Sequence, residues 1–300
     1  LESLGVMVLH GNTVANHLEE ILREQLRGVD CILFNRPHIT KRYIDMLAEV
    51  YPDAKTIYYM HDMHGLREHL EKASAGAAWG APISLEGIEL LTPDEERIIC
   101  KVDLALTCSP KEQAMLSSAY GNVGIICPYA IHIPVDAAVD KAAYIAADGQ
   151  KTLLFVGGFG HTPNRIGIEW LVDYVLPLLQ EDIKIHVVGS RCPDDLKAKL
   201  EDHPLVVFHG FTSDAKLEEL LRQTAVSLAP LPYGAGIKGK VVEAFAAGHT
   251  VIGSEYGIEG MEDAPEGIYF TCSTPQDFAD AIGQVFRRDR AAWIESTHCL

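Results

Sequence analysis

Residues 229–248 have the sequence Ala229-Pro-Leu-Pro-Tyr-Gly-Ala-Gly-Ile-Lys-Gly-Lys-Val-Val-Glu-Ala-Phe-Ala-Ala-Gly248, which is the most informative part of the chain. It contains the end of an apolar run at 226–229, a glycine-rich loop, and a helix-period segment at 238–247. A strand, a glycine-rich loop and a helix in this order are typical of parallel α/β sheets, which bind ligands at the carboxyl ends of their strands. The stretch therefore predicts a ligand site in an α/β domain.

The loop combines free backbone N–H groups with positive side chains. The N-terminus of a helix behind a glycine loop offers unpaired N–H groups and a partial positive charge to an anion. Lys238 and Lys240 add two full charges, and Glu243 follows on the first turns of the helix, where it can accept hydrogen bonds from a sugar hydroxyl. The natural ligand is a phosphate or diphosphate. From the residues alone, a tight strand–helix turn with surface lysines is an equal alternative.

Apolar runs alternate with helix-period segments on both sides of this stretch. After residue 150, strands are predicted at 152–156, 183–188, 205–208, 226–229, 250–253 and 268–271, and helices at 163–179, 193–201, 215–223, 238–247 and 275–287. Before residue 128, strands are predicted at 5–9, 31–34, 55–60, 104–107 and 123–127, and helices at 14–26, 43–50, from about 66, 93–101 and 111–119. This alternation predicts parallel sheets covered on both faces.

A break in the alternation divides the chain. Residues 128–136 contain Pro128 and Pro134 and follow the last strand of the first part, so they are the predicted inter-domain linker. We therefore expect two Rossmann-like domains, at residues 1–135 and 136–300, that face each other.

A polar group directly follows the strand predicted at 55–60. Its sequence is His61-Asp62-Met63-His64-Gly65-Leu66-Arg67. Two histidines and a carboxylate can bind zinc, but the spacing lacks the i, i+4 pattern of helical ligands and no further ligand is evident, so no metal site is predicted. Hydrogen bonding to a substrate, with Arg67 as charged partner, is favoured, and plain structural polar contacts remain the alternative.

A second glycine loop, Gly157-Gly158-Phe159-Gly160-His161, follows the strand at 152–156. The dinucleotide fingerprint G-x-G-x-x-G fails in both frames, because Phe159 and Pro163 occupy required glycine positions. The pattern argues against a dehydrogenase, and we expect no bound cofactor. The loop still allows a ligand to approach the backbone near Gly158 and His161.

Composition excludes several classes of function. The net charge is −17 and lysines and arginines are not clustered, which argues against nucleic acid as a partner. No run of 18 apolar residues is present, so no transmembrane segment is predicted. Seven cysteines include no CxxC pair, and several, such as Cys31 and Cys127, lie in apolar runs typical of small buried residues. We expect a reducing, cytoplasmic location, with a peripheral position at the inner membrane left open.

Ordered motifs in the second part resemble a known family. Residues 153–164, Leu-Leu-Phe-Val-Gly-Gly-Phe-Gly-His-Thr-Pro-Asn, are similar to the opening strand and loop of the donor domain in retaining glycosyltransferases of family four. The resemblance covers roughly residues 150–285. The motifs that follow in order are Val187-Val188-Gly189, Phe208-His209-Gly210-Phe211, Ala229-Pro230-Leu231, Gly234-Ala235-Gly236-Ile237-Lys238 with Glu243-Ala244 and Gly248, and Gly257-Ile258-Glu259-Gly260-Met261.

The first part resembles a bacterial subgroup of the same family that is often linked to polysaccharide assembly. The matching motifs are Asn35-Arg36-Pro37, Tyr51-Pro52-Asp53-Ala54-Lys55 and Asp62-Met63-His64-Gly65-Leu66-Arg67. The resemblance implies the GT-B fold, in which two Rossmann-like domains face each other across a cleft. It also implies transfer of a sugar from a nucleotide diphosphate to the hydroxyl of a glycan or lipid-linked acceptor, with retention of configuration and without a metal.

The resemblance further implies roles for individual residues. The loop that binds the diphosphate comprises Gly236, Ile237, Lys238, Gly239 and Lys240. Glu243 accepts hydrogen bonds from the ribose, the backbone at Phe211 borders the base, and Gly158 and His161 lie in the other donor loop. The region that faces the donor sugar from the first domain, and the candidate catalytic group, is His61, Asp62, His64 and Arg67.

The sequence departs from the family pattern at two residues. Ala235 stands eight positions before Glu243, where the family has a second glutamate, and Gly158 replaces a common arginine, so the phosphate charge must come from Lys238, Lys240 or Arg165. The first domain also begins near its third strand, which predicts a piece of a longer multidomain protein or an abbreviated domain. Two alternatives follow: a catalytically impaired nucleotide-sugar-binding or interaction module, and, ranked last, a nucleotide-sugar 2-epimerase.

Overall fold

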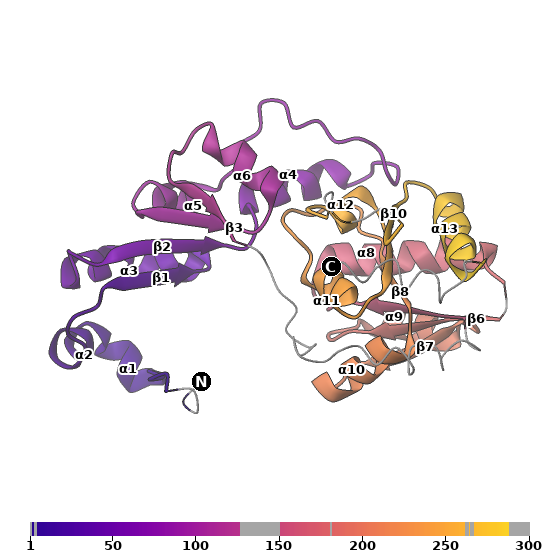
Figure 1. The fold of residues 1–300 in the computed structure, drawn as a ribbon, viewed down its shortest axis with the longest axis horizontal. Helices are drawn as coiled ribbons and strands as arrows, with labels where there is room; N and C mark the ends of the chain where they lie inside the picture. The colour runs from indigo at the N-terminus through magenta and orange to yellow at the C-terminus, as the bar shows by residue number, and fades with distance from the viewer. Residues whose placement is uncertain are drawn as a thin grey trace.

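A computed structural model describes residues 2, 5–126, 151–180, 182–261, 264 and 267–287. In these ranges the strands form two parallel sheets, of order β1-β2-β3-β4 and β10-β9-β8-β5-β6-β7 (Figure 1). The first sheet contains β1 (Cys31–Asn35), β2 (Lys55–Met60), β3 (Leu104–Thr107) and β4 (Val123–Ile125). The second contains β5 (Lys151–Val156), β6 (Ile183–Val188), β7 (Val206–Gly210), β8 (Val226–Ala229), β9 (Thr250–Gly253) and β10 (Tyr269–Thr271).

Helices connect the strands, as parallel pairing requires. In the first part they are α1 (Asn12–Asn16), α2 (Leu18–Gln25), α3 (Pro37–Val50), α4 (His64–Ser74), α5 (Pro93–Ile99) and α6 (Pro110–Ser117). In the second they are α8 (Thr162–Trp170), α9 (Asp194–Asp202), α10 (Asp214–Gln223), α11 (Gly239–Ala246), α12 (Glu255–Ile258) and α13 (Pro275–Arg287). The helix predicted at 163–179 continues past α8 as a π-helical turn (Leu171–Val175) and a 3-10 turn (Leu176–Leu178), where Pro177 lacks the N–H of a regular helix.

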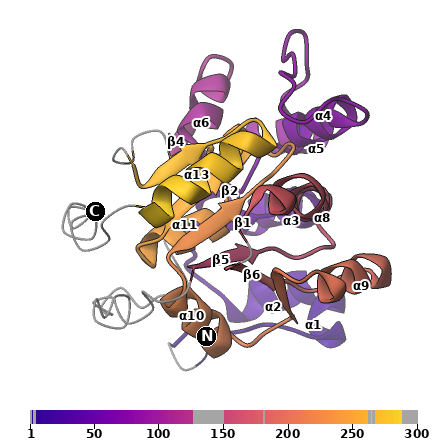
Figure 2. The ribbon, with the colours of Figure 1, turned by 90° about the vertical axis from the view of Figure 1, so that its right-hand side faces the viewer.

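The second sheet reverses its strand order between β5 and β8. From β5 the chain adds β6 and β7 on one side, and β8, β9 and β10 lie on the other. One face of the sheet packs on α8, α9 and α13, and the other packs on α10 and α11 (Figure 2). In open α/β sheets such a reversal opens a crevice at the carboxyl ends of the strands. The loops after β5 and β8, at 157–161 and 230–238, are therefore neighbours at the expected ligand position.

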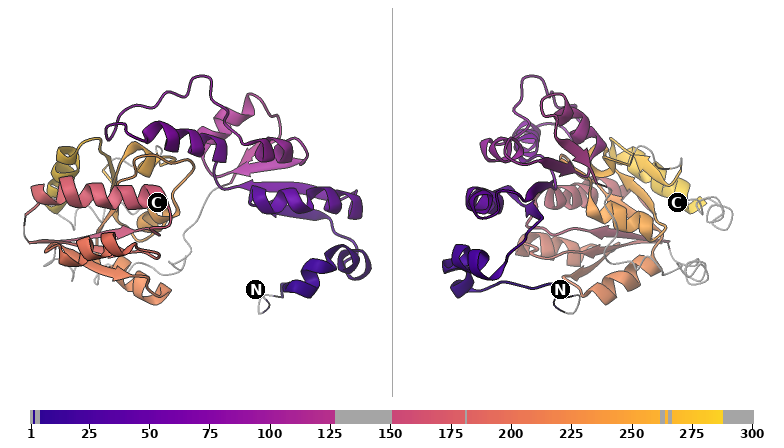
Figure 3. Two further views of the ribbon diagram at one scale, coloured as in Figure 1. Left: turned by 180° about the vertical axis from the view of Figure 1, so that it is seen from behind. Right: turned by 60° about the vertical axis from the view of Figure 1, so that its left-hand side comes forward.

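The first sheet has one well-covered face. Phe34, Tyr58 and Met60 point toward the helices α3 to α6 and form a buried core with them. The expectation of two covered faces is wrong for this sheet, because Leu33 on the opposite face is 65% exposed. Its neighbours across the sheet on that face, Ile57 and Leu104, are only partly buried. Figures 1 and 3 show α1 and α2 beyond this sheet, and α2 is tied to the end of α3, since the Tyr51 hydroxyl donates to carbonyls of α2 and its C-cap.

Three expectations near the N-terminus are corrected by the structure. Residues 5–9 form no strand, because their backbone pairs with no strand of the described residues. The apolar side chains at 6–9 are 37–70% exposed. The helix predicted at 14–26 is divided at His17 into α1 and α2. Cys31 is exposed, because alternate side chains of the edge strand β1 point away from the core, whereas Cys108 and Cys272 are buried free thiols.

The helix α8 begins one residue earlier than predicted. His161, and not Thr162, is the residue before its first turn, and its side chain makes no capping hydrogen bond. The linker predicted at 128–136 lies outside the described residues, as does Cys127, and the domain division at 135/136 stays a prediction. The two sheets fall on either side of that division.

A strap of residues 75–91 connects α4 to α5 and contacts the second domain. Trp79 of the strap stacks on Trp170 of α8, with ring centroids 3.9 Å apart and planes 9° from parallel. Gly80 approaches Ser273 so closely that a Cβ atom would lie 2.9 Å from its carbonyl oxygen. Figure 1 shows this strap reaching from the end of α4 toward β10 and α12 before it returns to the first sheet. The strap therefore anchors one domain on the other.

Removing the stacked ring should loosen this anchor. We expect Trp79→Ala to lower the free energy of unfolding by about 2 kcal/mol, because a large aromatic contact is lost at a partly buried site. Urea denaturation measures this loss, and limited proteolysis should cut the strap faster in the variant. Tyr174→Ala is the matched control, since Tyr174 also touches Trp170 but is 58% exposed. Equal stability of the two variants would contradict the anchoring role.

Candidate functional site

The loops after β2 and β8 meet across the two domains at Gly236. The φ angle of Gly236 is +68°, and a Cβ atom there would lie 2.7 Å from the carbonyl oxygen of His61 and 3.2 Å from Cβ of Asp62. Only glycine combines this backbone conformation with so close an approach. The contact brings the polar group at 61–67 and the glycine-rich loop, which were predicted separately, to one place.

In the first domain, Asp62 connects two cationic side chains. Its carboxylate accepts a hydrogen bond from the Arg67 guanidinium and lies 3.4 Å from His64 Nε2. Burial opposes ionisation, but the hydrogen bond from His64 and the charge of Arg67 keep the pKa of Asp62 below its usual value. The same hydrogen bond raises the pKa of His64, so His64 is favoured as an imidazolium.

The pKa of His61 is shifted in the opposite direction, to lower values. Its Nε2 lies 2.6 Å from Oδ1 of Asn35, at the end of the neighbouring strand β1. Burial and the nearby charge of Arg36 lower its pKa, so the neutral ring is favoured. The pKa values of the two histidines in the H-D-x-H group are thus shifted in opposite directions, which a sequence pattern alone does not distinguish.

Two buried carboxylates hold this loop from behind, and neither was predicted from the sequence. Glu112 on α6 accepts hydrogen bonds from the Met63 N–H at 3.2 Å and from the Thr107 hydroxyl at 2.8 Å. Glu95 on α5 accepts the N–H of His64 at 3.0 Å. Both side chains are fully buried. The S-x-x-E and T-x-x-E patterns that contain them indicate helix starts, and this was the only signal available in the sequence.

In the second domain, Lys238 is held by groups of its own domain. Its ammonium lies 3.3 Å from Oε2 of Glu259 and donates to the carbonyls of Ala235 and Gly236. Its side chain is only 12% exposed. The interpretation of Lys238 as a plain surface lysine is therefore wrong, because the loop folds around its ammonium.

Lys240 occupies a different environment. It donates to Oδ1 of Asn164 at 2.8 Å, and its ammonium lies 4.7 Å from the centre of the Phe155 ring. Burial, with a contribution from the charge of Lys238, lowers the pKa of Lys240 to about 7. No ion pair to Lys240 is found in the described residues. This lysine is therefore the buried cation of the loop, and in that part of the chain its partners are an amide oxygen and an aromatic ring.

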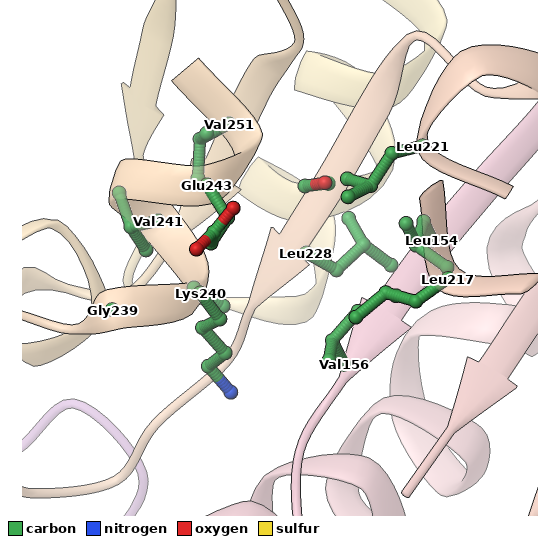
Figure 4. A pocket seen from close by; sticks show the side chains of 12 residues that line it. Leu154, Val156, Leu217, Leu221, Leu228, Gly239, Lys240, Val241, Glu243 and Val251 are labelled. Atoms are coloured by element: carbon green, nitrogen blue, oxygen red, sulfur yellow. The ribbon is translucent and has the colours of Figure 1, made fainter. Parts of the chain in front are cut away.

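Lys240 and Glu243 line a pocket of about 270 Å³. Figure 4 shows both side chains entering from α11 on one side, while apolar side chains face them from the strands and α10. The volume is just below the usual range for small-molecule sites, and mostly apolar walls with a few polar groups are typical of them. The apolar wall includes Leu154, Val156, Leu217, Leu221 and Leu228.

The loop after β5 lies against the same cleft. The pKa of His161 is lowered by burial and by the charges of Arg67 and Lys240. Charged groups of both domains therefore act on this ring. Arg165 points elsewhere, because it pairs with Glu169 and Asp195. Gly158 stands where the family that the sequence resembles has an arginine, and Arg165 does not supply that guanidinium.

Arg191, which the sequence analysis did not single out, packs on this loop. A Cβ atom at Gly160 would lie 3.0 Å from Cδ of Arg191 and 3.4 Å from one of its terminal nitrogens. Arg191 also has a φ angle of +58°, which is uncommon for a residue with a side chain. This exposed cation replaces Arg165 as the candidate for the guanidinium near Gly158.

The predicted site residues are thus gathered unequally. The first-domain group, Gly236, Lys238, Lys240 and His161 lie around one cleft. Phe211, expected to border the base, follows β7 two strands away from β5, and its side chain is 80% exposed. Ala235, in the place of a family glutamate, is buried and packs in the core of the first domain.

The described residues contain neither a metal-binding cluster nor a membrane-spanning helix. No three His, Cys, Asp or Glu side chains gather there in a metal-binding arrangement. No helix within the described ranges is both long and apolar enough to cross a bilayer.

The second part of the chain matches a known family. Residues 150–288 match the sequence model of the family described as Glycosyl transferases group 1. No curated protein matches the chain. The matched residues contain the whole second sheet and the loops that carry Lys238, Lys240 and His161.

Solved structures share the fold over both domains. TarM is 15% identical with a TM-score of 0.64, over 89% of this chain and 50% of TarM. HepE from Anabaena, solved in complex with UDP, is 15% identical with a TM-score of 0.63, over 95% of this chain and 73% of HepE. Sucrose-phosphate synthase from Thermosynechococcus elongatus is 20% identical with a TM-score of 0.65, over 95% and 69%. These likenesses confirm the predicted GT-B fold, and the chain spans about half the length of TarM.

The buried Glu112 gives the protein a pH-dependent stability. Burial raises its pKa from 4.5 to about 7, so the folded protein binds this proton more tightly than the unfolded chain does. Stability is therefore lost as the pH rises through this interval, by up to about 3 kcal/mol. We expect Glu112→Gln to flatten the stability profile between about pH 5 and pH 8, measured by urea denaturation.

The control for this experiment is Glu68→Gln, which changes an exposed carboxylate on α4. It should keep the slope of the wild-type profile, because water contacts an exposed carboxylate in the folded and in the unfolded chain. The histidines that titrate in the same interval are present in all three proteins, so they do not account for a difference between the profiles. A Glu112→Gln profile parallel to the wild type would show that Glu112 is ionised at neutral pH.

Proposed function

We propose that the protein transfers a sugar from a nucleotide-diphosphate donor to a hydroxyl of a glycan or lipid-linked acceptor, with retention of configuration. One observation carries the proposal: the glycine-rich loop with Lys238 and Lys240 lies at the reversal of the second sheet and contacts the Asp62 loop of the first. The family match of residues 150–288 supports the class of reaction. The fold shared with sugar-nucleotide enzymes agrees with it.

The charges of the cleft suit the chemistry of the donor. When a sugar leaves a diphosphate, negative charge grows on the phosphate and positive charge on the sugar ring. Lys238, Lys240 and the start of α11 would stabilise the first, and a preorganised donor of this kind is worth roughly 3 kcal/mol. Asp62, which is paired with Arg67, would face the positive charge on the sugar ring. The leaving phosphate can take the proton of the acceptor hydroxyl, so no separate protein base is required.

The pocket beside Lys240 would receive the nucleoside. Its apolar wall fits the flat face of a base, and Glu243 can accept hydrogen bonds from ribose hydroxyls. The structure of HepE with UDP makes UDP the first nucleotide to test. Phe211 remains the proposed border of the base through its backbone. A cytoplasmic location and a longer native protein belong to the same proposal, which the free cysteines and the half-length match to TarM support.

A second candidate is a nucleotide-sugar-binding module without transfer activity. Ala235 cannot supply a carboxylate to the donor sugar, and the ammonium of Lys238 is engaged by Glu259 and two loop carbonyls. Such a protein would bind the nucleotide and leave the sugar attached. A transfer or hydrolysis assay with the bound donor therefore separates the two candidates.

Nucleotide binding should depend on Lys238. We expect one of UDP, GDP, TDP and ADP to bind in a calorimetric titration, and Lys238→Ala to weaken that binding about tenfold to a hundredfold, because a charge-assisted contact is lost. Lys199→Ala is the control, since Lys199 pairs with Asp173 on the surface of the second domain. Binding that survives in Lys238→Ala would place the diphosphate elsewhere, and absence of binding to any nucleotide would sink the proposal for this chain.

Diphosphate binding should also take up a proton at Lys240. An anion beside an ammonium favours its charged form, so a lysine with a pKa of about 7 is protonated further when a diphosphate arrives. Titrations near pH 8 in two buffers of different ionisation enthalpy should give different heats. The difference should shrink in Lys240→Met, which keeps the apolar stem. Equal proton uptake by the two proteins would contradict this role.

A further inference from the structure

Glu95 makes more contacts than a helix cap requires. It is the third residue of α5, and its Oε2 accepts the N–H and the hydroxyl of Thr92, both at 2.9 Å. The Thr92 hydroxyl in turn accepts the N–H of Glu95, which completes a capping box. One carboxylate oxygen is sufficient for this motif. The other oxygen points to a different element.

That second oxygen contacts His64 at the edge of the cleft. Oε1 of Glu95 accepts the N–H of His64 at 3.0 Å and lies 3.6 Å from Nδ1 of its ring. On the other side of the ring, Nε2 lies 3.4 Å from Oδ1 of Asp62. The imidazole is thus placed between two carboxylates, one from α5 and one from its own loop. Glu95 is fully buried, whereas 18% of the His64 side chain is exposed.

We propose that Glu95 is a positioning residue of the cleft, which fixes the backbone and ring of His64 so that His64 remains an imidazolium in front of a buried carboxylate. The effect of Glu95 on binding of the sugar donor rests on the proposed function, whereas its effect on the charge of His64 does not. Glu95 lies fully buried on one side of the ring, and the partly exposed carboxylate of Asp62 lies on the other side. Two negative charges beside one ring favour its cationic form.

The other groups around His64 are consistent with this assignment. The hydrogen bond with Asp62 is the main cause that raises the pKa of His64, the charge of Glu95 adds to it, and burial and the charge of Arg67 oppose it. His61, the remaining titratable neighbour, has a lowered pKa and is neutral at pH 7, so it adds little repulsion. Arg67 is itself bound to Asp62, whereas no lysine or arginine of the described residues pairs with Glu95. Removing the charge of Glu95 therefore changes the balance at His64 directly.

The test is an NMR titration of the histidine rings in the full chain, with the His64 signal assigned by its loss in His64→Asn. The wild-type midpoint should lie above that of an ordinary histidine, and Glu95→Gln should move it toward lower pH. Glu96→Gln is the matched control on the same helix, because Glu96 is exposed and its carboxylate accepts a hydrogen bond from the Tyr120 hydroxyl rather than from the loop of His64. Thr92→Ala removes the cap and should lower stability without moving the midpoint.

Binding measurements give the second readout. With UDP, or with whichever of the four nucleotides binds in the calorimetric titration, Glu95→Gln should bind more weakly than the wild type near pH 7. At acid pH the two proteins should bind equally well, because His64 is then protonated in both. An unchanged His64 midpoint in Glu95→Gln would overturn the inference, and so would a wild-type midpoint at or below the ordinary value, which decides the case even if the variant does not fold. If no nucleotide binds but His64 titrates as expected, the proposed function fails and the role of Glu95 in the charge of His64 stands.

Discussion

The close contact at Gly236 is the constraint on which the site depends. The backbone of the glycine-rich loop can approach the carbonyl of His61 only because position 236 has no side chain and has a positive φ angle. Through this contact the carboxyl ends of two separate sheets share one cleft. Asp62 then lies within the electrostatic reach of Lys238, and His161 within that of Arg67. Each domain alone would present half of this charge arrangement.

Within that cleft, the charges are organised by buried carboxylates. Glu112 and Glu95 support the loop of the first domain, and Glu259 holds Lys238 in the second. None of these side chains is open to solvent, so water screens them weakly. The cations are consequently of different kinds: Lys238 is paired, His64 is favoured as charged, and Lys240 is close to its titration point at neutral pH. A ligand with a diphosphate would meet all three.

The fold was predictable because its signals are local. The strands at 183–188, 226–229 and 250–253 and the helix at 275–287 have the predicted bounds, since continuous apolar runs and helical periodicity are readable within one element. Residues 5–9 show the limit of that approach, because an apolar run forms a strand only when another strand pairs with it. The site was predicted as separate loops. The partners that set its charges are 31, 49 and 21 residues away from His64, Met63 and Lys238, and no local pattern connects them.

The strap has a mechanical consequence for the cleft. Trp79 belongs to the first domain by sequence, but its ring is packed against α8 of the second. If the domains rotate to admit a ligand, the ring will stay with α8, and the chain that leads to it will have to bend. Gly76, with a φ angle of +82° and open space around it, precedes the tryptophan and supplies this freedom, whereas Gly80 is packed on Ser273. The stacked pair would then act as a fixed pivot, and the range of opening would be set by the bend at Gly76 rather than by the width of the cleft.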